Sequence, residues 1–137
     1  MIKRIAHVGI ATRSIAVAME FYKNLGLEVD TIELVKDQKV KVAVMKVGDS
    51  AIELIEATEE DSPIQRFIEK CDEGIHHITF EVDNLKEQLK FLKEKNIQLI
   101  DEKPRRGAEG SLIAFIHPDS TGGVLIELCQ PAPEESL

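Results

Sequence analysis

The stretch IAHVGIATRSIAVAMEFYKNLGLEV (5–29) decides the fold, because it has a counterpart in IHHITFEVDNLKEQLKFLKEKNIQL (75–99). A shift of 70 positions superimposes His7 on His77 and aligns the apolar residues along both stretches. Gly26 falls on Asn96, and both residue types tolerate the left-handed conformation that ends a helix. Self-similarity at a fixed spacing predicts two copies of one structural unit.

A second match extends the repeat to the ends of both halves. Ile52-Glu53-Leu54 overlays Ile126-Glu127-Leu128 at a shift of 74, so the second half carries four more residues in its middle hairpin. Hydrophobic periodicity predicts β-α-β-β-β for each half. The expected strands are 3–11, 27–35, 40–44 and 51–56, then 76–82, 97–101, 112–116 and 123–128. Two helices are expected to begin at Ser14 and at Asn84. A short linker helix is expected at 62–70.

These elements predict an α+β fold of two tandem βαβββ modules, about 3–58 and 75–130, within one domain at 1–131. Neither half has enough apolar surface to fold well alone. Two curved antiparallel sheets placed side by side would give a cup-like, eight-stranded mixed sheet with the helices outside. The proline-spaced tail 132–137 is expected to be flexible.

Strand alternation predicts which side chains face into this cup. Four side chains, each on a different predicted strand, point away from their apolar neighbours: His7, Glu53, His77 and Glu127. A single strand histidine is usually structural, and a single glutamate beside Ile and Leu usually faces solvent. The recurrence of all four at matched repeat positions instead favours a metal site. Two imidazoles and two carboxylates suit one divalent ion per chain in an open octahedral site: cobalt first, with nickel, manganese, zinc or iron as alternatives.

The composition excludes several classes of partner. The formal charge of −8 argues against nucleic acid or an anionic membrane as the main partner. No apolar run has the length of a membrane span, and the N-terminus lacks the apolar stretch of a signal peptide. Cys71 and Cys129 have no CxxC spacing, which favours reduced thiols in a cytoplasmic protein.

Several segments resemble a known family. They are IAHVGIA (5–11), AIELIE (51–56), DSPI (61–64), GIHHITFEVD (74–83), PRRGAEG (104–110), IAFIHP (113–118) and GGVLIEL (122–128). The chain resembles the vicinal oxygen chelate superfamily and, within it, the methylmalonyl-CoA epimerase family. The resemblance implies the ligand set His7, Glu53, His77 and Glu127. It also implies interconversion of the (R) and (S) epimers of methylmalonyl-CoA by α-proton abstraction through a metal-stabilised enolate.

The sequence also offers candidate residues for proton transfer and for binding of coenzyme A. Family members with an acid on the third strand would place it where this chain has Val42, so Glu127 and Glu53 are the candidate catalytic bases. Lys103, Arg105 and Arg106 precede a glycine-containing loop and could bind the phosphates of coenzyme A or form a solvated charge cluster. A homodimer is expected, since paired modules usually associate further.

Two other functions remain compatible with the four predicted ligands. Glyoxalase I, which acts on a glutathione hemithioacetal, uses the same ligand positions, although the GIHH and GVLIEL segments favour the epimerase. A non-catalytic binding protein of the superfamily usually lacks a complete ligand set. An extradiol dioxygenase fits less well, because that class uses two histidines and one glutamate and generally has a longer chain.

Overall fold

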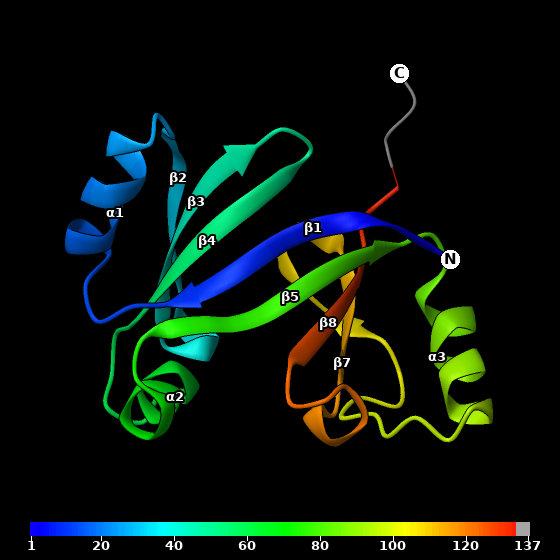
Figure 1. Ribbon diagram of the computed structural model, residues 1–137. Helices are drawn as coiled ribbons and strands as arrows, with labels where there is room; N and C mark the ends of the chain where they lie inside the picture. The colour runs from blue at the N-terminus through cyan, green and yellow to red at the C-terminus, as the bar shows by residue number, and fades with distance from the viewer. Residues whose placement is uncertain (134–137) are drawn as a thin grey trace. The chain divides into compact units, whose positions relative to one another are not determined.

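The computed structural model describes residues 1–133 and contains one mixed sheet of eight strands in the order β2-β3-β4-β1-β5-β8-β7-β6 (Figure 1). The strands are β1 Ile2–Ala11, β2 Val29–Val35, β3 Val40–Val47, β4 Ser50–Ala57, β5 Gly74–Val82, β6 Arg105–Arg106, β7 Leu112–Ile116 and β8 Leu125–Gln130. The α-helices are α1 Ile15–Asn24, α2 Pro63–Cys71 and α3 Leu85–Glu94. The predicted α+β class with an eight-stranded mixed sheet is confirmed. Most of the tail predicted to be flexible, at 134–137, lies outside the described residues.

Two units divide the chain, and the boundary falls inside β1. Within the described residues, one unit comprises 1–6 and 77–133, and the other comprises 7–76. The first residues of β1 belong with the second repeat because their side chains pair there. Arg4 lies 3.2 Å from the Glu81 carboxylate, and the N-terminal ammonium lies 2.9 Å from Asp83. Each unit therefore contains one of the two predicted repeats, apart from this exchanged segment.

In the unit of residues 7–76, helices pack on both faces of the strands. Ser14 caps α1 by accepting a hydrogen bond from the Val17 amide at 3.2 Å, as its position predicts. Ile15 of α1 packs with buried Ala43, Met45 and Leu54 on one face. The other face, which by alternation carries His7 and Glu53, is covered at one end by α2, where Ile64 and Ile68 pack with Ala11, Val40 and Ile55.

In the unit containing residues 77–133, α3 covers a single face. Asn84 caps this helix by accepting from the Glu87 amide at 3.1 Å, and Asn96 adopts a positive φ of 62° just after it. The repeat predicted this left-handed residue from its alignment with Gly26, whose φ is 100°. Leu85 and Leu89 of α3 pack with buried side chains of the strands, namely Val82, Ala114, Ile116 and Leu128. His77 and Glu127 lie on the opposite face, which α3 does not cover.

Strand pairing differs from the prediction in the same way in both repeats. The first and last strands of each repeat pair in parallel, β1 with β4 and β5 with β8, whereas antiparallel sheets were expected. The alternation that aims the four predicted ligands is unaffected, because it depends on each strand alone.

The predicted strand at 97–101 is wrong, since this segment forms only a single bridge between Leu99 and Ile116. The Asp101 carboxylate accepts the hydrogen bond from the Phe115 amide at 2.8 Å, which takes a donor that a continuing ladder would use. The short strand β6 was not predicted, and its two residues pair with β7 beyond this interruption. β8 begins at Leu125 rather than Gly123 because Gly122 and Gly123 both have positive φ.

Candidate metal centre

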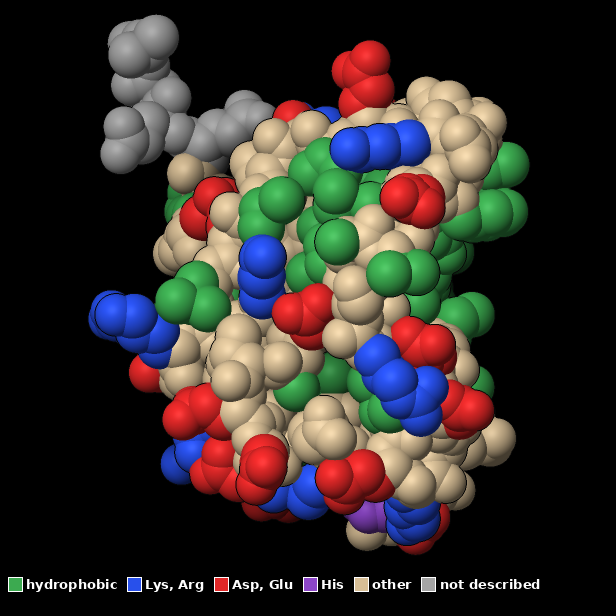
Figure 2. All heavy atoms as spheres, turned by 90° about the vertical axis from the view of Figure 1, so that its left-hand side faces the viewer, with side chains coloured by type: hydrophobic (Ala, Val, Ile, Leu, Met, Phe, Trp, Pro, Cys, Tyr) green, Lys and Arg blue, Asp and Glu red, His purple; other side chains and the backbone are tan. Residues whose placement is uncertain are grey.

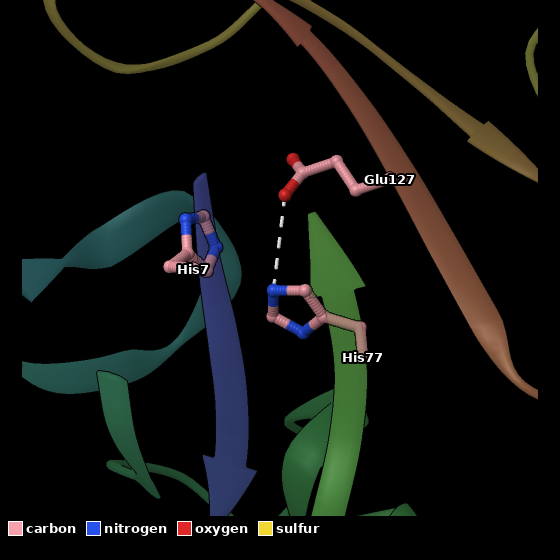
Figure 3. A group of neighbouring side chains, drawn as sticks. All are labelled: His7, His77 and Glu127. Atoms are coloured by element: carbon pink, nitrogen blue, oxygen red, sulfur yellow. Dashed lines mark ion pairs between the residues drawn. The ribbon is translucent and has the colours of Figure 1, made fainter. Parts of the chain in front are cut away.

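His77 and Glu127 lie on neighbouring parallel strands and face the same side of the sheet. The His77 Nε2 atom is 3.7 Å from Glu127 Oε1, the ion pair drawn as a dashed line in Figure 3. About a tenth of each side chain is exposed. The register of β5 and β8 pairs Thr79 directly with Glu127, and the Thr79 hydroxyl donates a hydrogen bond to Oε1 at 2.6 Å. A buried carboxylate is thus held beside an imidazole by two adjacent strands.

The surroundings of Glu127 affect its pKa in opposite directions. Burial raises the pKa, since removal from water disfavours the charged carboxylate. The Thr79 hydrogen bond and the positive charge of Arg105 lower it, and the charge of Asp101 raises it. A bound cation would act in the same direction as Thr79 and Arg105, and would offset the cost of burying the carboxylate.

His7 and Glu53 form the equivalent pair in the other unit. The strands β1 and β4 are parallel, Gly9 pairs with Glu53, and His7 Nδ1 lies 3.2 Å from Glu53 Oε2. The contact with Glu53 favours a protonated imidazole, whereas burial favours the neutral form. Burial has the larger effect and lowers the pKa of His7 to about 4. His7 is therefore neutral near pH 7, the form in which histidine binds a metal.

The structure forms two repeat-related His–Glu pairs, His7–Glu53 in one unit and His77–Glu127 in the other. His77 and Glu127 are candidate metal ligands within one unit (Figure 3), and Glu53 is held beside His7 in the other. Neutral imidazole nitrogen and carboxylate oxygen fit a divalent ion of the cobalt, nickel, manganese or zinc group. The carboxylate beside His7 Nδ1 also corresponds to the outer partner that commonly orients a metal-binding histidine.

The predicted basic residues lie on different surfaces of their unit. The Arg105 guanidinium lies 5.3 Å from the centroid of the Phe115 ring, and this ring meets His77 edge to face at 6.4 Å. Arg105 therefore shares the face of His77 and Glu127. Alternation turns Arg106 to the opposite side. Lys103 instead lines a cavity of about 860 Å³ beside α3.

Three further positions bear on the predicted site. Val42, where related proteins can carry an acid, packs against the apolar cluster beneath α2. His117 accepts a hydrogen bond from the Asp119 amide at 3.1 Å, and so caps the short turn that follows β7. His76 meets the ring of Phe67 on α2 edge to face at 4.9 Å, which is a packing contact.

Sequence reasoning missed Thr79, Asp101 and Phe115 as neighbours of the site. A signal existed for Thr79, because it is two residues beyond His77 and alternation places it on the same face. Phe115 could have been found in the same way only with the β7–β8 register, which pairs it with Glu127. Asp101 has no such signal, since the segment around it is irregular.

Comparison with known proteins identifies the superfamily of this chain. The sequence pattern of the Glyoxalase/Bleomycin resistance protein/Dioxygenase superfamily matches residues 6–115, and the chain belongs to this superfamily. The chain is 48% identical over 133 residues to the uncharacterized protein YqjC of Bacillus subtilis, covering 96% of this chain and 95% of that protein.

Two similar proteins are methylmalonyl-CoA epimerases. The mitochondrial enzyme of Bos taurus is 39% identical over 129 residues, covering 93% of this chain and 74% of that protein. A solved structure of the Streptomyces coelicolor enzyme in complex with 2-nitronate-propionyl-CoA has 35% identity and a TM-score of 0.89, and the match covers 100% of both chains.

Among residues 1–133, no helix combines the length and the apolar character needed to cross a membrane.

The lowered pKa of His7 predicts how the metal-free protein responds to acid. Its unfolded-state pKa is near 6.5 and its folded value is about 4, so between these values the unfolded chain binds more protons. The free energy of unfolding should therefore fall as the pH drops from about 6.5 to about 4, by at most about 3 kcal/mol from this group. NMR titration of the histidine ring protons, with His7→Asn to assign the resonance, measures the pKa. A His7 midpoint above 6 would contradict the prediction.

Proposed function

We propose that this protein is a metal-dependent epimerase that interconverts (R)- and (S)-methylmalonyl-CoA. The observation that carries the proposal is the pair of repeat-related His–Glu sets, His7–Glu53 and His77–Glu127, in a chain whose relatives include methylmalonyl-CoA epimerases over most of their length. Under this proposal His7, Glu53, His77 and Glu127 hold one divalent ion. When bound, the ion supplies positive charge that stabilises the negative charge developing on the thioester oxygen as the α-proton leaves.

The chain's own carboxylates would move the proton. The substrate carbon lies between a thioester and a carboxylate, and inversion requires removal of its proton from one side and delivery to the other. Glu127 and Glu53 belong to equivalent positions of the two repeats, which suits one carboxylate on each side of the substrate. One carboxylate accepts the proton as the C–H bond breaks, and the other, as a carboxylic acid, donates one. Proton exchange with water then restores the starting states.

Arg105 is the basic residue best placed for an anionic substrate. Its guanidinium lies over Phe115, on the same face as Glu127, while Asp101 holds its Nε atom at 3.4 Å. The free carboxylate or the phosphates of an acyl-CoA could accept further charge-assisted hydrogen bonds from this guanidinium, which has five N–H donors. Lys103 faces the cavity beside α3, with Lys90 and Lys93, and would meet a more distant part of the nucleotide.

We also propose that the protein forms a homodimer. Val17, Phe21 and Leu25 of α1 are each more than half exposed. Figure 2, which looks at this side, shows hydrophobic side chains gathered among charged ones. Such surface is often covered by a second copy of a chain.

The proposed activity is tested by deuterium exchange. Protein stripped with a chelator, and then supplied separately with Co²⁺, Ni²⁺, Mn²⁺ or Zn²⁺, is incubated with one epimer of methylmalonyl-CoA in D₂O. Exchange of the α-proton and appearance of the other epimer, followed by NMR, are expected only after metal is restored. The hemithioacetal of methylglyoxal and glutathione serves as the competing substrate. Turnover of that compound without exchange in methylmalonyl-CoA would assign the protein to glyoxalase chemistry instead.

Replacing each candidate base should slow proton exchange. Glu127→Gln and Glu53→Gln are expected to lower the exchange rate by about 10²- to 10⁴-fold, the usual contribution of a positioned acid or base. Glu33→Gln, on exposed β2, is the matched control and should leave the rate unchanged. Metal content is measured for each variant, so that loss of the ion is separated from loss of a base. Undiminished wash-in of deuterium from both epimers in either variant would remove that residue from proton transfer.

Adjacent arginines on opposite faces give a test of substrate binding. Arg105→Ala should raise KM by about tenfold and change kcat less, because a charge-assisted contact to the bound anion is lost. Arg106→Ala removes the same charge from the other side of the strand and should have a smaller effect. Steady-state kinetics at two ionic strengths distinguishes the pair. Equal increases in KM would show that only net charge matters.

A further inference from the structure

Thr79 is a fully buried polar residue beside the predicted metal ligands. Its exposed fraction is 0%, and its hydroxyl donates to Glu127 Oε1 at 2.6 Å. This distance is typical of a hydroxyl bonded to an ionised carboxylate, which is among the stronger hydrogen bonds in proteins. Burial of a hydroxyl is costly without such a partner. The position therefore contributes a directed interaction with one oxygen of the carboxylate.

The register of the sheet explains why Thr79 meets Glu127. In the parallel pair of β5 and β8 the two residues are direct partners, so their side chains leave the same face at neighbouring points. The first repeat has the same register, and there the partner of Glu53 is Gly9. Glycine has no side chain and can donate no hydroxyl. The two repeat-related carboxylates thus have the same backbone setting and a different side chain opposite them.

The hydrogen bond restricts how Glu127 can turn. With Oε1 held by Thr79 and 3.7 Å from His77 Nε2, rotation of the carboxylate about its last bond would break a strong contact. A ligand already fixed in orientation loses less conformational entropy when an ion binds. Outer partners of this kind typically change metal affinity by about 10- to 100-fold when removed.

We propose that Thr79 is a positioning residue that fixes Glu127 for metal binding, and that this interaction exists in the second repeat alone because Gly9 stands at the equivalent place. The proposal rests on the proposed metal-dependent function. It makes the two carboxylates unequal: Glu127 is oriented by a hydroxyl on the neighbouring strand, and Glu53 is oriented by the imidazole of His7.

Cobalt binding without substrate tests the proposal. The affinity of the metal-free protein for Co²⁺ is measured by calorimetry and by the visible absorption of the bound ion. Thr79→Val removes the hydroxyl at nearly constant volume and should raise the dissociation constant by about 10- to 100-fold. Thr79→Ser keeps the hydroxyl and should bind Co²⁺ with nearly the affinity of the unmodified protein. If the valine variant does not fold, comparison of Thr79→Ser with Thr79→Ala isolates the hydroxyl in the same way.

Thr12→Val is the matched control. Thr12 is also buried and also donates to a glutamate, since its hydroxyl lies 2.9 Å from the Glu73 carboxylate, away from the predicted ligands. This variant should lose some stability and keep its cobalt affinity. Unchanged affinity in Thr79→Val, or an equal loss in Thr79→Ser, would overturn the positioning role while cobalt binding and proton exchange by the unmodified protein still support the proposed function. A failure of the unmodified protein to bind any of Co²⁺, Ni²⁺, Mn²⁺ and Zn²⁺ would overturn both.

Discussion

Parallel pairing between the first and last strands of each repeat is the constraint on which the site depends. In β1 with β4, and again in β5 with β8, it sets a histidine beside a glutamate on the same face. The opposite face of each strand pair is occupied by the packing of α1 or α3. A shift of one residue in either register would turn the histidine or the glutamate into the apolar core, where an unpaired charge is costly. Fold and site are therefore specified by the same hydrogen-bonded ladders.

Much of this could be predicted from the sequence because the signal is local and occurs twice. Alternation along each strand assigns a face to His7, Glu53, His77 and Glu127 without any knowledge of strand order. The caps at Ser14 and Asn84 and the left-handed residues Gly26 and Asn96 were likewise identified correctly, since each depends on a few neighbouring residues. The repeat then confirms each assignment by an independent copy.

What the sequence did not reveal depends on contacts between distant segments. The parallel direction of β1 with β4 follows from how the chain returns, which alternation does not encode. The irregular segment around Leu99 was predicted as a strand because it is apolar. In the structure the Asp101 carboxylate accepts the hydrogen bond from the Phe115 amide. Strand pairing with β7 resumes only at Arg105 and Arg106. Competition between a side chain and the backbone for one donor is invisible to hydrophobic periodicity.

The repeat places one His–Glu pair in each unit, and the departures from it give the two glutamates different neighbours. Both glutamates are placed by the same ladder, yet Glu127 has Thr79 and Phe115 as its strand neighbours and Glu53 has Gly9 and Val44. In the proposed reaction each carboxylate would act as the base in one direction and as the acid in the other, so their proton affinities can differ without preventing inversion. A perfectly symmetric pair of carboxylates would have equal proton affinities and equal freedom to move. Substituting the residues opposite them breaks this equality while the backbone that aims both is retained.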